Sequence, residues 1–308
     1  MGTPRRYARR MGSDLGTLPP SFTRRCPAPI TPTGRRGLER LFTQPGRALV
    51  ALDFDGVLAP IVDDPEQARA HPDAVPALAR LAPRLGTIAV ITGRPAAVAV
   101  EYGGFAGVPD LDGLVVLGAY GAETWDAADG EVLAPPPHPS VAAVREELPA
   151  ELAGVPGTEG VHIEDKGGAV AVHTRRADRP AAVLARLREP MARLAERHGL
   201  VVEPGRMVLE LRPPGMDKGR ALTALALRTG ATSVVYVGDD LGDLAAFSAV
   251  DALRGEGVGG LLVCSGSEEV GELADRSDLV VDGPEGVVAL LEALAAPLDA
   301  PDDRPTNP

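Results

Sequence analysis

The stretch ALVALDFDGVL, residues 48–58, decides how the chain folds. A run of strand-forming apolar residues ends in two aspartates, Asp53 and Asp55, which are followed at once by Gly56. Such a run is typical of a buried parallel strand, and in open α/β sheets the chemistry lies just beyond the carboxyl ends of these strands. Two carboxylates held this close repel each other unless a cation or a shared proton lies between them. The stretch therefore indicates a divalent metal site in which one carboxylate can act as a nucleophile.

Other segments of the chain repeat this pattern of a short apolar strand and a polar turn. We expect further strands at residues 87–91, 114–117, 233–237, 261–263 and 279–281. The stretches 73–85 and 217–227 between them have apolar residues at helical spacing. Strands and helices that alternate in this way predict an α/β fold with a doubly wound parallel sheet.

The pattern changes between residues 127 and 211. Here two consecutive strands precede a long helix, which predicts a smaller α+β domain inserted into the sheet domain. The sheet domain, called the core below, then consists of residues 41–126 and 212–296. We expect the Arg-rich leader 1–40 and the Pro-rich tail 297–308 to be disordered.

Charge and composition argue against several classes of protein. The chain carries a net charge of −12, although its first 40 residues contain nine arginines against two acids, so the body offers no basic face for nucleic acid. No apolar run is long enough to span a membrane, and the leader lacks the apolar segment of a secretory signal. Cys26 and Cys264 are too few for a disulfide framework or a zinc site. We expect a monomeric cytoplasmic protein without nucleic-acid or membrane partners.

The polar residues that follow the predicted strands suit phosphoryl transfer. Asp53 can attack phosphorus, Asp55 can pass a proton to a leaving group, and Thr92 can contact a phosphoryl oxygen. Lys218 is one of only two lysines in the chain and supplies a compact positive charge. Positioning and charge neutralisation are most of what phosphoryl transfer requires.

A second acidic cluster follows the predicted strand 233–237. Asp239, with Asp240 or Asp243 beside it, can complete an oxygen shell for Mg²⁺. Each signal also has a simpler interpretation when it is taken alone: acids in a solvated turn, a strand-to-helix turn at the threonine, a surface lysine, or aspartates at a helix N-terminus. Their shared position at strand ends favours an active site.

Four of these segments resemble motifs I to IV of the haloacid dehalogenase superfamily over residues 47–294, and the insert resembles its type 2 cap. Within that superfamily the chain is similar to the trehalose-6-phosphate phosphatase family. The stretches that carry this similarity are LDFDGVLAP at 52–60, EDKG at 164–167 with HTR at 173–175, and RMVLELRP at 206–213 with KG at 218–219.

The resemblance implies Mg²⁺-dependent hydrolysis of trehalose 6-phosphate to trehalose and phosphate through an aspartyl-phosphate. It implies Asp53 as the nucleophile and Asp55 as the general acid and base, with Thr92 and Lys218 as phosphate ligands. The carboxylates of Asp53 and Asp239 and the carbonyl of Asp55 would bind Mg²⁺. The other residues expected to bind the substrate are Gly93, Arg94, Glu164, Lys166 and Glu210, of which the last three would hold the sugar hydroxyls from the cap.

The chain departs from the family at three places: Ala119-Tyr120-Gly121 stands where a His-Gly segment is common, GDDLGDL occupies 238–244, and Arg206-Met207 replaces Gly-Lys. These departures leave the phosphate chemistry intact and the shape of the sugar pocket open. The alternatives are a capped phosphatase for another sugar phosphate or phosphorylated glycoside, a receiver-type signalling domain, and a catalytically silent sugar-phosphate sensor.

Overall fold

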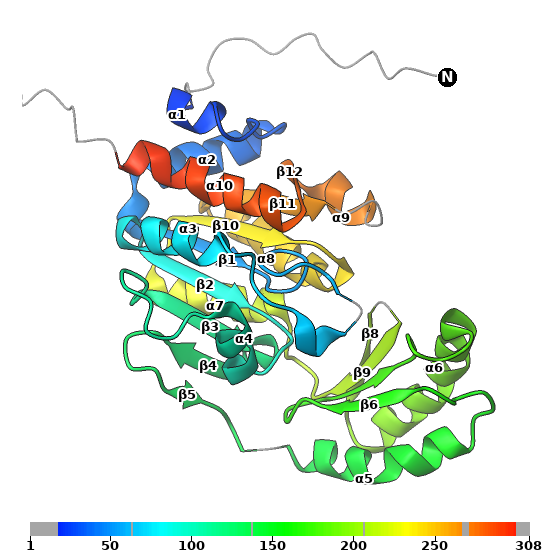
Figure 1. Cartoon of the computed structure of the whole chain (residues 1–308). Helices are drawn as coiled ribbons and strands as arrows, with labels where there is room; N and C mark the ends of the chain where they lie inside the picture. Colours follow the sequence, from blue (N-terminus) through cyan, green and yellow to red (C-terminus); the bar gives the residue numbers. More distant parts are fainter. Residues whose placement is uncertain (1–17, 63, 137, 206, 267–270, 300–308) are drawn as a thin grey trace, which may run out of the picture.

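An eight-stranded sheet forms the centre of the core in the computed structural model, which describes residues 18–299 except 63, 137, 206 and 267–270 (Figure 1). Its strands are β1 (Ala48–Leu52), β2 (Thr87–Ile91), β3 (Leu114–Gly118), β4 (Glu123–Asp126), β5 (Val132–Leu133), β10 (Ser233–Gly238), β11 (Gly259–Gly266) and β12 (Leu279–Asp282). They lie in the order β12-β11-β10-β1-β2-β3-β4-β5. The strands from β12 to β3 are parallel, and β4 and β5 continue the sheet in antiparallel fashion. The predicted α/β fold is confirmed.

Helices cover both faces of this sheet because its central strands are apolar on both sides. Val50 and Leu52 of β1 belong to one apolar cluster, and Leu49 and Ala51 belong to the other. The first face is covered by α2 (Pro32–Thr43), α3 (Ala74–Leu81), α4 (Ala96–Gly103) and α10 (Gly283–Leu298), and the second by α7 (Lys218–Thr229), α8 (Leu244–Gly255) and α9 (Gly271–Arg276). Short 3₁₀ turns lie at Pro45–Arg47, Pro65–Gln67, Ala82–Arg84, Ala119–Gly121 and Leu241–Asp243.

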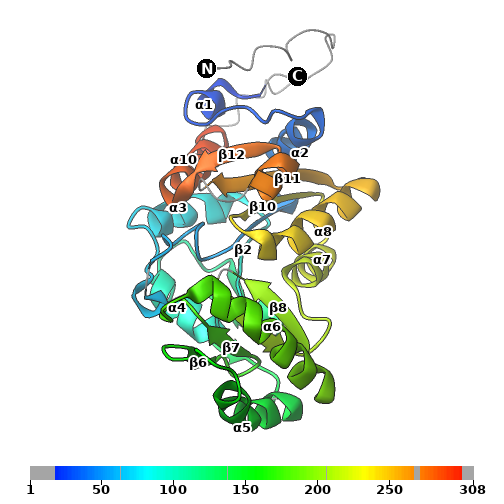
Figure 2. The same cartoon turned by 90° about the vertical axis from the view of Figure 1, so that its right-hand side faces the viewer.

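The inserted domain, called the cap below, has a sheet of its own (Figures 1 and 2). Its strands are β6 (His162–Asp165), β7 (Val170–His173), β8 (Val201–Gly205) and β9 (Val208–Arg212), in the antiparallel order β6-β7-β9-β8. The helices α5 (Pro139–Ala153) and α6 (Pro180–Arg197) pack on one face of it around Leu148, Leu187 and Leu211. The predicted α+β insert is therefore confirmed, whereas its limits, 127–211, stay a prediction.

The expectation that residues 1–40 are disordered is wrong for residues 18–40. This segment forms α1 (Pro20–Thr23) and most of α2, and Phe22, Leu38 and Leu41 are fully buried. Arginines dominate the composition of the leader, but its few apolar residues are spaced so that one face of α2 covers the sheet. Residues 1–17, and the tail from residue 300, lie outside the described residues.

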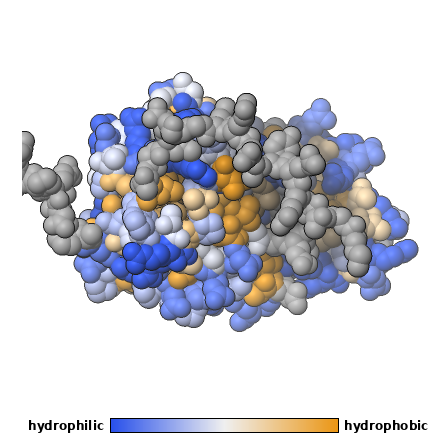
Figure 3. Space-filling model, turned by 90° about the horizontal axis from the view of Figure 1, so that it is seen from above, coloured by the Kyte–Doolittle hydropathy of each residue, from blue (hydrophilic) through white to orange (hydrophobic). Residues whose placement is uncertain are grey.

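The segment before α2 also covers part of the sheet edge at β12. The Ile30 amide donates to the Asp278 carbonyl at 2.7 Å, and the Thr31 hydroxyl donates to the Asp278 carboxylate. Figure 3 looks onto this side of the molecule, where apolar surface lies among hydrophilic residues. Ile30 and Val280 are the large apolar side chains exposed on these two segments. Within the described part of the chain, no helix combines the length and apolar character that crossing a membrane requires.

Gly37→Ala tests whether α2 is an integral part of the core. A Cβ at Gly37 would overlap the backbone of Gly260 in β11, so α2 and β11 must separate to admit it. We expect a loss of about 1–3 kcal/mol in the free energy of unfolding, measured by urea denaturation. The control is Gly46→Ala, where a Cβ meets nothing within 4 Å, so its effect should stay within about 0.5 kcal/mol. Equal stability of the two variants would contradict the packing of α2.

Candidate active site

The ends of neighbouring strands bring the predicted catalytic residues together. Asp53 directly follows β1, which lies between β10 and β2 (Figure 1). Asp239 follows β10, and Thr92 follows β2. Lys218 is the first residue of α7, on the face of the sheet beside β1 and β10. One edge of the sheet therefore collects all four residues.

Asp53 and Lys218 form a buried ion pair, each being 5% exposed. Lys218 Nζ donates to Asp53 Oδ2 at 2.6 Å, and the Phe54 amide donates to Asp53 Oδ1 at 2.7 Å. Burial alone would lower the pKa of Lys218, but the carboxylates of Asp243 and Asp53 raise it, so the ammonium stays charged. Asp53 thus has a fixed orientation before any ligand arrives.

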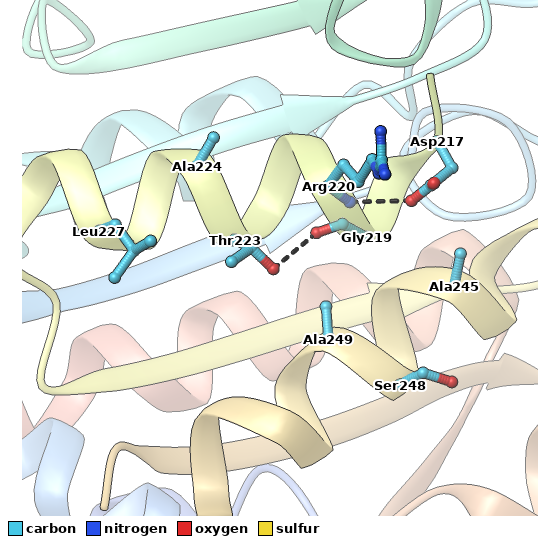
Figure 4. Close-up of a pocket in the computed structure, with 9 residues that line it drawn as sticks. All are labelled: Asp217, Gly219, Arg220, Thr223, Ala224, Leu227, Ala245, Ser248 and Ala249. Atoms are coloured by element: carbon cyan, nitrogen blue, oxygen red, sulfur yellow. Dashed lines mark hydrogen bonds between the residues drawn. The ribbon is translucent and has the colours of Figure 1, made fainter. Parts of the chain in front are cut away.

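The start of α7 fixes the position of Lys218. The Asp217 carboxylate accepts the Arg220 amide at 2.8 Å and caps the helix (Figure 4). The pocket drawn in Figure 4 has a volume of about 510 Å³ and lies between α7 and α8. Asp217 is the only acid among the residues that line this pocket, and its carboxylate already accepts the Arg220 amide as the N-cap of α7. The pocket is therefore a surface hollow separate from the acidic cluster.

Three buried or half-buried acids meet beside Lys218 and could hold a metal ion. Carboxylate oxygens of Asp53, Asp239 and Asp243 lie within 4.8 Å of one another. Burial and the nearby Asp53 charge raise the pKa of Asp239 to about 9, and burial also raises the pKa of Asp53 well above its usual range. Gly56 has a left-handed backbone (φ 71°), and a Cβ there would overlap the Asp239 carboxylate. An all-oxygen donor set with excess negative charge fits a hard divalent cation.

Asp243 organises this cluster, a role that the sequence left undecided between Asp240 and Asp243. Its carboxylate accepts from Lys218 Nζ at 2.8 Å, from the Tyr236 hydroxyl at 2.7 Å, and from the amides of Asp239 at 2.9 Å and Asp240 at 3.2 Å. The Asp240 carboxylate instead accepts the Gly242 amide at 2.8 Å within the turn. The sequence analysis also missed Tyr236, for which the only signal was a hydroxyl in an otherwise aliphatic buried strand.

Asp55 and Arg94 form a second ion pair at the same edge. Arg94 Nε and Nη2 each donate to one Asp55 oxygen at 2.7 Å, a two-point contact that fixes both groups. Thr92 is buried, and its hydroxyl accepts the Arg94 amide at 3.1 Å. The structure therefore brings Asp55, Thr92, Gly93 and Arg94 together beside Asp53. The Asp55 carboxylate does not belong to the cluster of acids found among the described residues.

The predicted sugar-binding residues lie on the cap face opposite α5 and α6. Glu164 pairs with Ala171, and Ala171 pairs with Glu210, so both glutamates project from one side with a small residue between them. Lys166 Nζ donates to Glu210 Oε2 at 2.6 Å, and His173 Nε2 lies 2.8 Å from Glu164 Oε2. The second Glu210 oxygen, Oε1, is buried and has no hydrogen-bond partner among the residues that the structure describes.

Electrostatic contact links this cap face to the core. Burial raises the pKa of Glu164, but the His173 hydrogen bond and the charges of Lys166, His173 and Arg94 lower it overall. Burial lowers the pKa of Lys166, and the Glu210 and Glu164 charges raise it overall, against a smaller opposing effect of Arg94. The Arg94 charge of the core thus acts on both cap residues. In addition, the guanidinium carbon of Arg212 on the cap lies 4.9 Å from the ring centroid of Tyr120 in the core, so this cap face lies against the core.

Comparison with known proteins gives consistent matches. The family model for trehalose-phosphatase matches residues 51–281. The chain is 38% identical over 263 residues to a trehalose-phosphate phosphatase of Mycobacterium avium, covering 81% of this chain and 62% of that protein, and 34% identical to one of Mycobacterium leprae, covering 81% and 58%. It therefore spans about 60% of the length of these relatives. Its fold is similar to that of the C-terminal domain of the trehalose-6-phosphate phosphatase of Candida albicans, with a TM-score of 0.68 and 21% identity over 88% of this chain and 98% of that one.

Asp239→Asn tests the metal site by protein stability. Because the pKa of Asp239 rises from 3.8 to about 9 on folding, the folded state binds the proton more tightly, and this group lowers stability as the pH rises between these values. In EDTA at pH 7.5 we expect the variant to melt about 2 °C or more above the wild type. Added Mg²⁺ should raise the melting temperature of the wild type but not that of the variant.

The control for this measurement is Asp129→Asn, in an exposed turn whose amide contact asparagine preserves. It should melt like the wild type under both conditions. An equal Mg²⁺ response of the Asp239 variant and the wild type would contradict the metal site.

Proposed function

The chain belongs to the trehalose-phosphatase family, and from this membership we propose that it is a Mg²⁺-dependent phosphatase that hydrolyses trehalose 6-phosphate to trehalose and phosphate. The observation that supports the proposal most is the pairing of two kinds of residue in one site. The buried Asp53–Lys218 pair suits attack on phosphorus, and the acid–lysine–acid set of Glu164, Lys166 and Glu210 suits sugar hydroxyls.

In the proposed first step an Asp53 oxygen attacks phosphorus in line with the sugar oxygen. A bond forms between Asp53 and phosphorus, the bond from phosphorus to the sugar oxygen breaks, and Asp55 gives that oxygen its proton. Water then attacks the aspartyl-phosphate and loses a proton to Asp55, which releases phosphate and restores Asp53. Lys218 and the Thr92 hydroxyl neutralise and hold the phosphoryl oxygens.

Asp53, Asp239 and the Asp55 carbonyl would hold Mg²⁺, and the donor set fits this ion because every atom is a hard oxygen. Bound there, Mg²⁺ supplies positive charge for the phosphoryl oxygens. Arg94 holds both Asp55 oxygens in the structure, so Asp55 becomes available for proton transfer when Arg94 turns to the substrate phosphate. Substrate binding would thereby free the Asp55 carboxyl group from Arg94 so that it can transfer a proton.

The proposed setting is the cytoplasm. Cys26 and Cys264 are both buried and unpaired, and burial raises the pKa of each thiol to about 11. Thiols that stay protonated at neutral pH are poor nucleophiles and suit a reducing compartment.

Asp53→Asn tests the nucleophile. Asparagine fits the same space and removes the attacking carboxylate, so turnover should fall by at least about 10³-fold. The measurement is phosphate release from trehalose 6-phosphate with Mg²⁺. Circular dichroism and a melting curve serve as the folding control, and turnover near the wild-type rate in the folded variant would refute the nucleophile.

Glu164→Ala and Lys166→Ala test the substrate class. If these side chains bind hydroxyls of the disaccharide, the preference for trehalose 6-phosphate over glucose 6-phosphate in kcat/KM should fall about 10-fold or more. The control is Glu189→Ala on α6, where the exposed carboxylate forms a surface ion pair with Arg193 and the preference should not change. If the wild type prefers another sugar phosphate when a panel is assayed, the proposed substrate is wrong, whereas the proposed reaction, phosphate-ester hydrolysis, still holds.

A further inference from the structure

Tyr120 lies between the cap and the loop 92–94, which is called the phosphate loop below because the proposed mechanism places the substrate phosphate there. The catalytic scheme above does not use Tyr120. Ala119 (φ 48°) and Tyr120 (φ 57°) are consecutive non-glycine residues in the left-handed region. Such conformations are strained for residues with a side chain, and they persist where the surroundings fix them. Here the Ala119 amide donates to the Arg94 carbonyl at 2.8 Å, and the Tyr120 amide donates to the Thr92 carbonyl at 3.0 Å. The phosphate loop itself thus holds Tyr120 in a strained conformation.

The phenol of Tyr120 reaches back over that loop. A Cβ at Gly93 would lie 2.7 Å from the Tyr120 hydroxyl oxygen and 2.8 Å from Cζ, so the ring fills the space beside Gly93. Burial raises the pKa of Tyr120 above its ordinary range. The Glu210 charge and the approach of the Glu210 side chain to the Tyr120 hydroxyl raise it further, while the charges of Lys218 and Arg212 oppose this. The hydroxyl is therefore protonated and able to donate, with Lys218 on its core side and Glu210 on its cap side.

Two cap side chains near this ring, those of Glu210 and Arg212, each carry a buried polar atom that lacks a hydrogen-bond partner among the described residues. Arg212, the last residue of β9, places its guanidinium carbon 4.9 Å from the Tyr120 ring centroid. Arg212 Nε and Glu210 Oε1 are both buried, and neither has a hydrogen-bond partner within the described part of the chain. A buried acceptor without a donor is costly, so Glu210 Oε1 is free to accept a hydrogen bond from a ligand hydroxyl or from a water.

We propose that Tyr120 is a specificity-determining residue that binds a sugar hydroxyl of the substrate together with Glu210. The sugar hydroxyl donates to Glu210 Oε1 and accepts from the Tyr120 hydroxyl. Tyr120 is hydrogen-bonded to the loop that would hold the phosphate. It would therefore select substrates in which the sugar hydroxyl lies at a fixed distance from the phosphate. This inference rests on the proposed function and extends it to a residue of the core.

Tyr120→Phe tests the inference, since it removes only the hydroxyl and keeps the ring against Gly93 and Arg212. We expect kcat/KM for trehalose 6-phosphate to fall about 10-fold, mainly through a higher KM. For p-nitrophenyl phosphate, which has no sugar hydroxyls, kcat/KM should stay within about 2-fold of the wild type. The control is Ser248→Ala, which removes a hydroxyl on the outer side of α8. It should leave kcat/KM unchanged for both substrates.

A double-mutant cycle separates binding from a structural role. If Tyr120 and Glu210 bind the same sugar hydroxyl, Tyr120→Phe should cost clearly less in the Glu210→Gln background than in the wild type. A purely structural tyrosine would lower activity toward both phosphates alike and give independent effects, and that result would overturn the proposal. So would an unchanged kcat/KM for the sugar phosphate in Tyr120→Phe.

The same assays distinguish failure of this inference from failure of the proposed function. If the wild type prefers a different sugar phosphate, the substrate assignment fails, and the Tyr120→Phe comparison is made with the preferred substrate. If the wild type hydrolyses only p-nitrophenyl phosphate and no sugar phosphate, both proposals are overturned.

Discussion

Buried negative charge at the ends of β1 and β10 is the constraint on which the rest of the site depends. Three carboxylates share a space less than 5 Å across, and one ammonium, that of Lys218, reaches two of them. Charges taken out of water are costly unless they are paired and hydrogen-bonded. Tyr236 and two backbone amides therefore point at Asp243, and the capped start of α7 holds Lys218 in place. The positive charge that is still lacking is what a divalent cation supplies.

The same constraint explains several small residues around the cluster. Gly56 leaves room for the Asp239 carboxylate, and its carbonyl accepts the buried Ser265 hydroxyl at 2.7 Å, which fixes the turn after Asp55. At Gly219 a Cβ would overlap the Ala245 carbonyl, so α7 and α8 can approach only because position 219 is glycine. Close packing of these two helices holds Lys218 and Asp243 at bonding distance.

The sequence was sufficient to predict the core because its signals are local. Each strand and the polar residues that follow it lie within about ten positions, so the acids at 53 and 239 and the threonine at 92 could be placed at one sheet edge. Residues 18–40 were misjudged because composition hides the spacing of Leu38 and Leu41. Asp243 remained one of two options because the choice depends on where Lys218 and Tyr236 lie. The importance of Tyr120 could not be predicted, since it arises from two loops and a cap strand that are distant in the chain.

In the proposed mechanism, selectivity and catalysis have different physical origins. Lys218, Thr92 and a cation would contact only phosphoryl oxygens, which every phosphate monoester shares. Two of the buried polar atoms that have no hydrogen-bond partner among the described residues, Glu210 Oε1 and Arg212 Nε, lie on the cap beside Tyr120 of the core, and a ligand without matching groups would leave them unsatisfied. The small, fully buried Ala171 separates Glu164 from Glu210 across the cap sheet, so the two carboxylates project on either side of it. The strained backbone at Ala119 and Tyr120 thereby places a phenol hydroxyl between Gly93 of the core and Arg212 of this cap face.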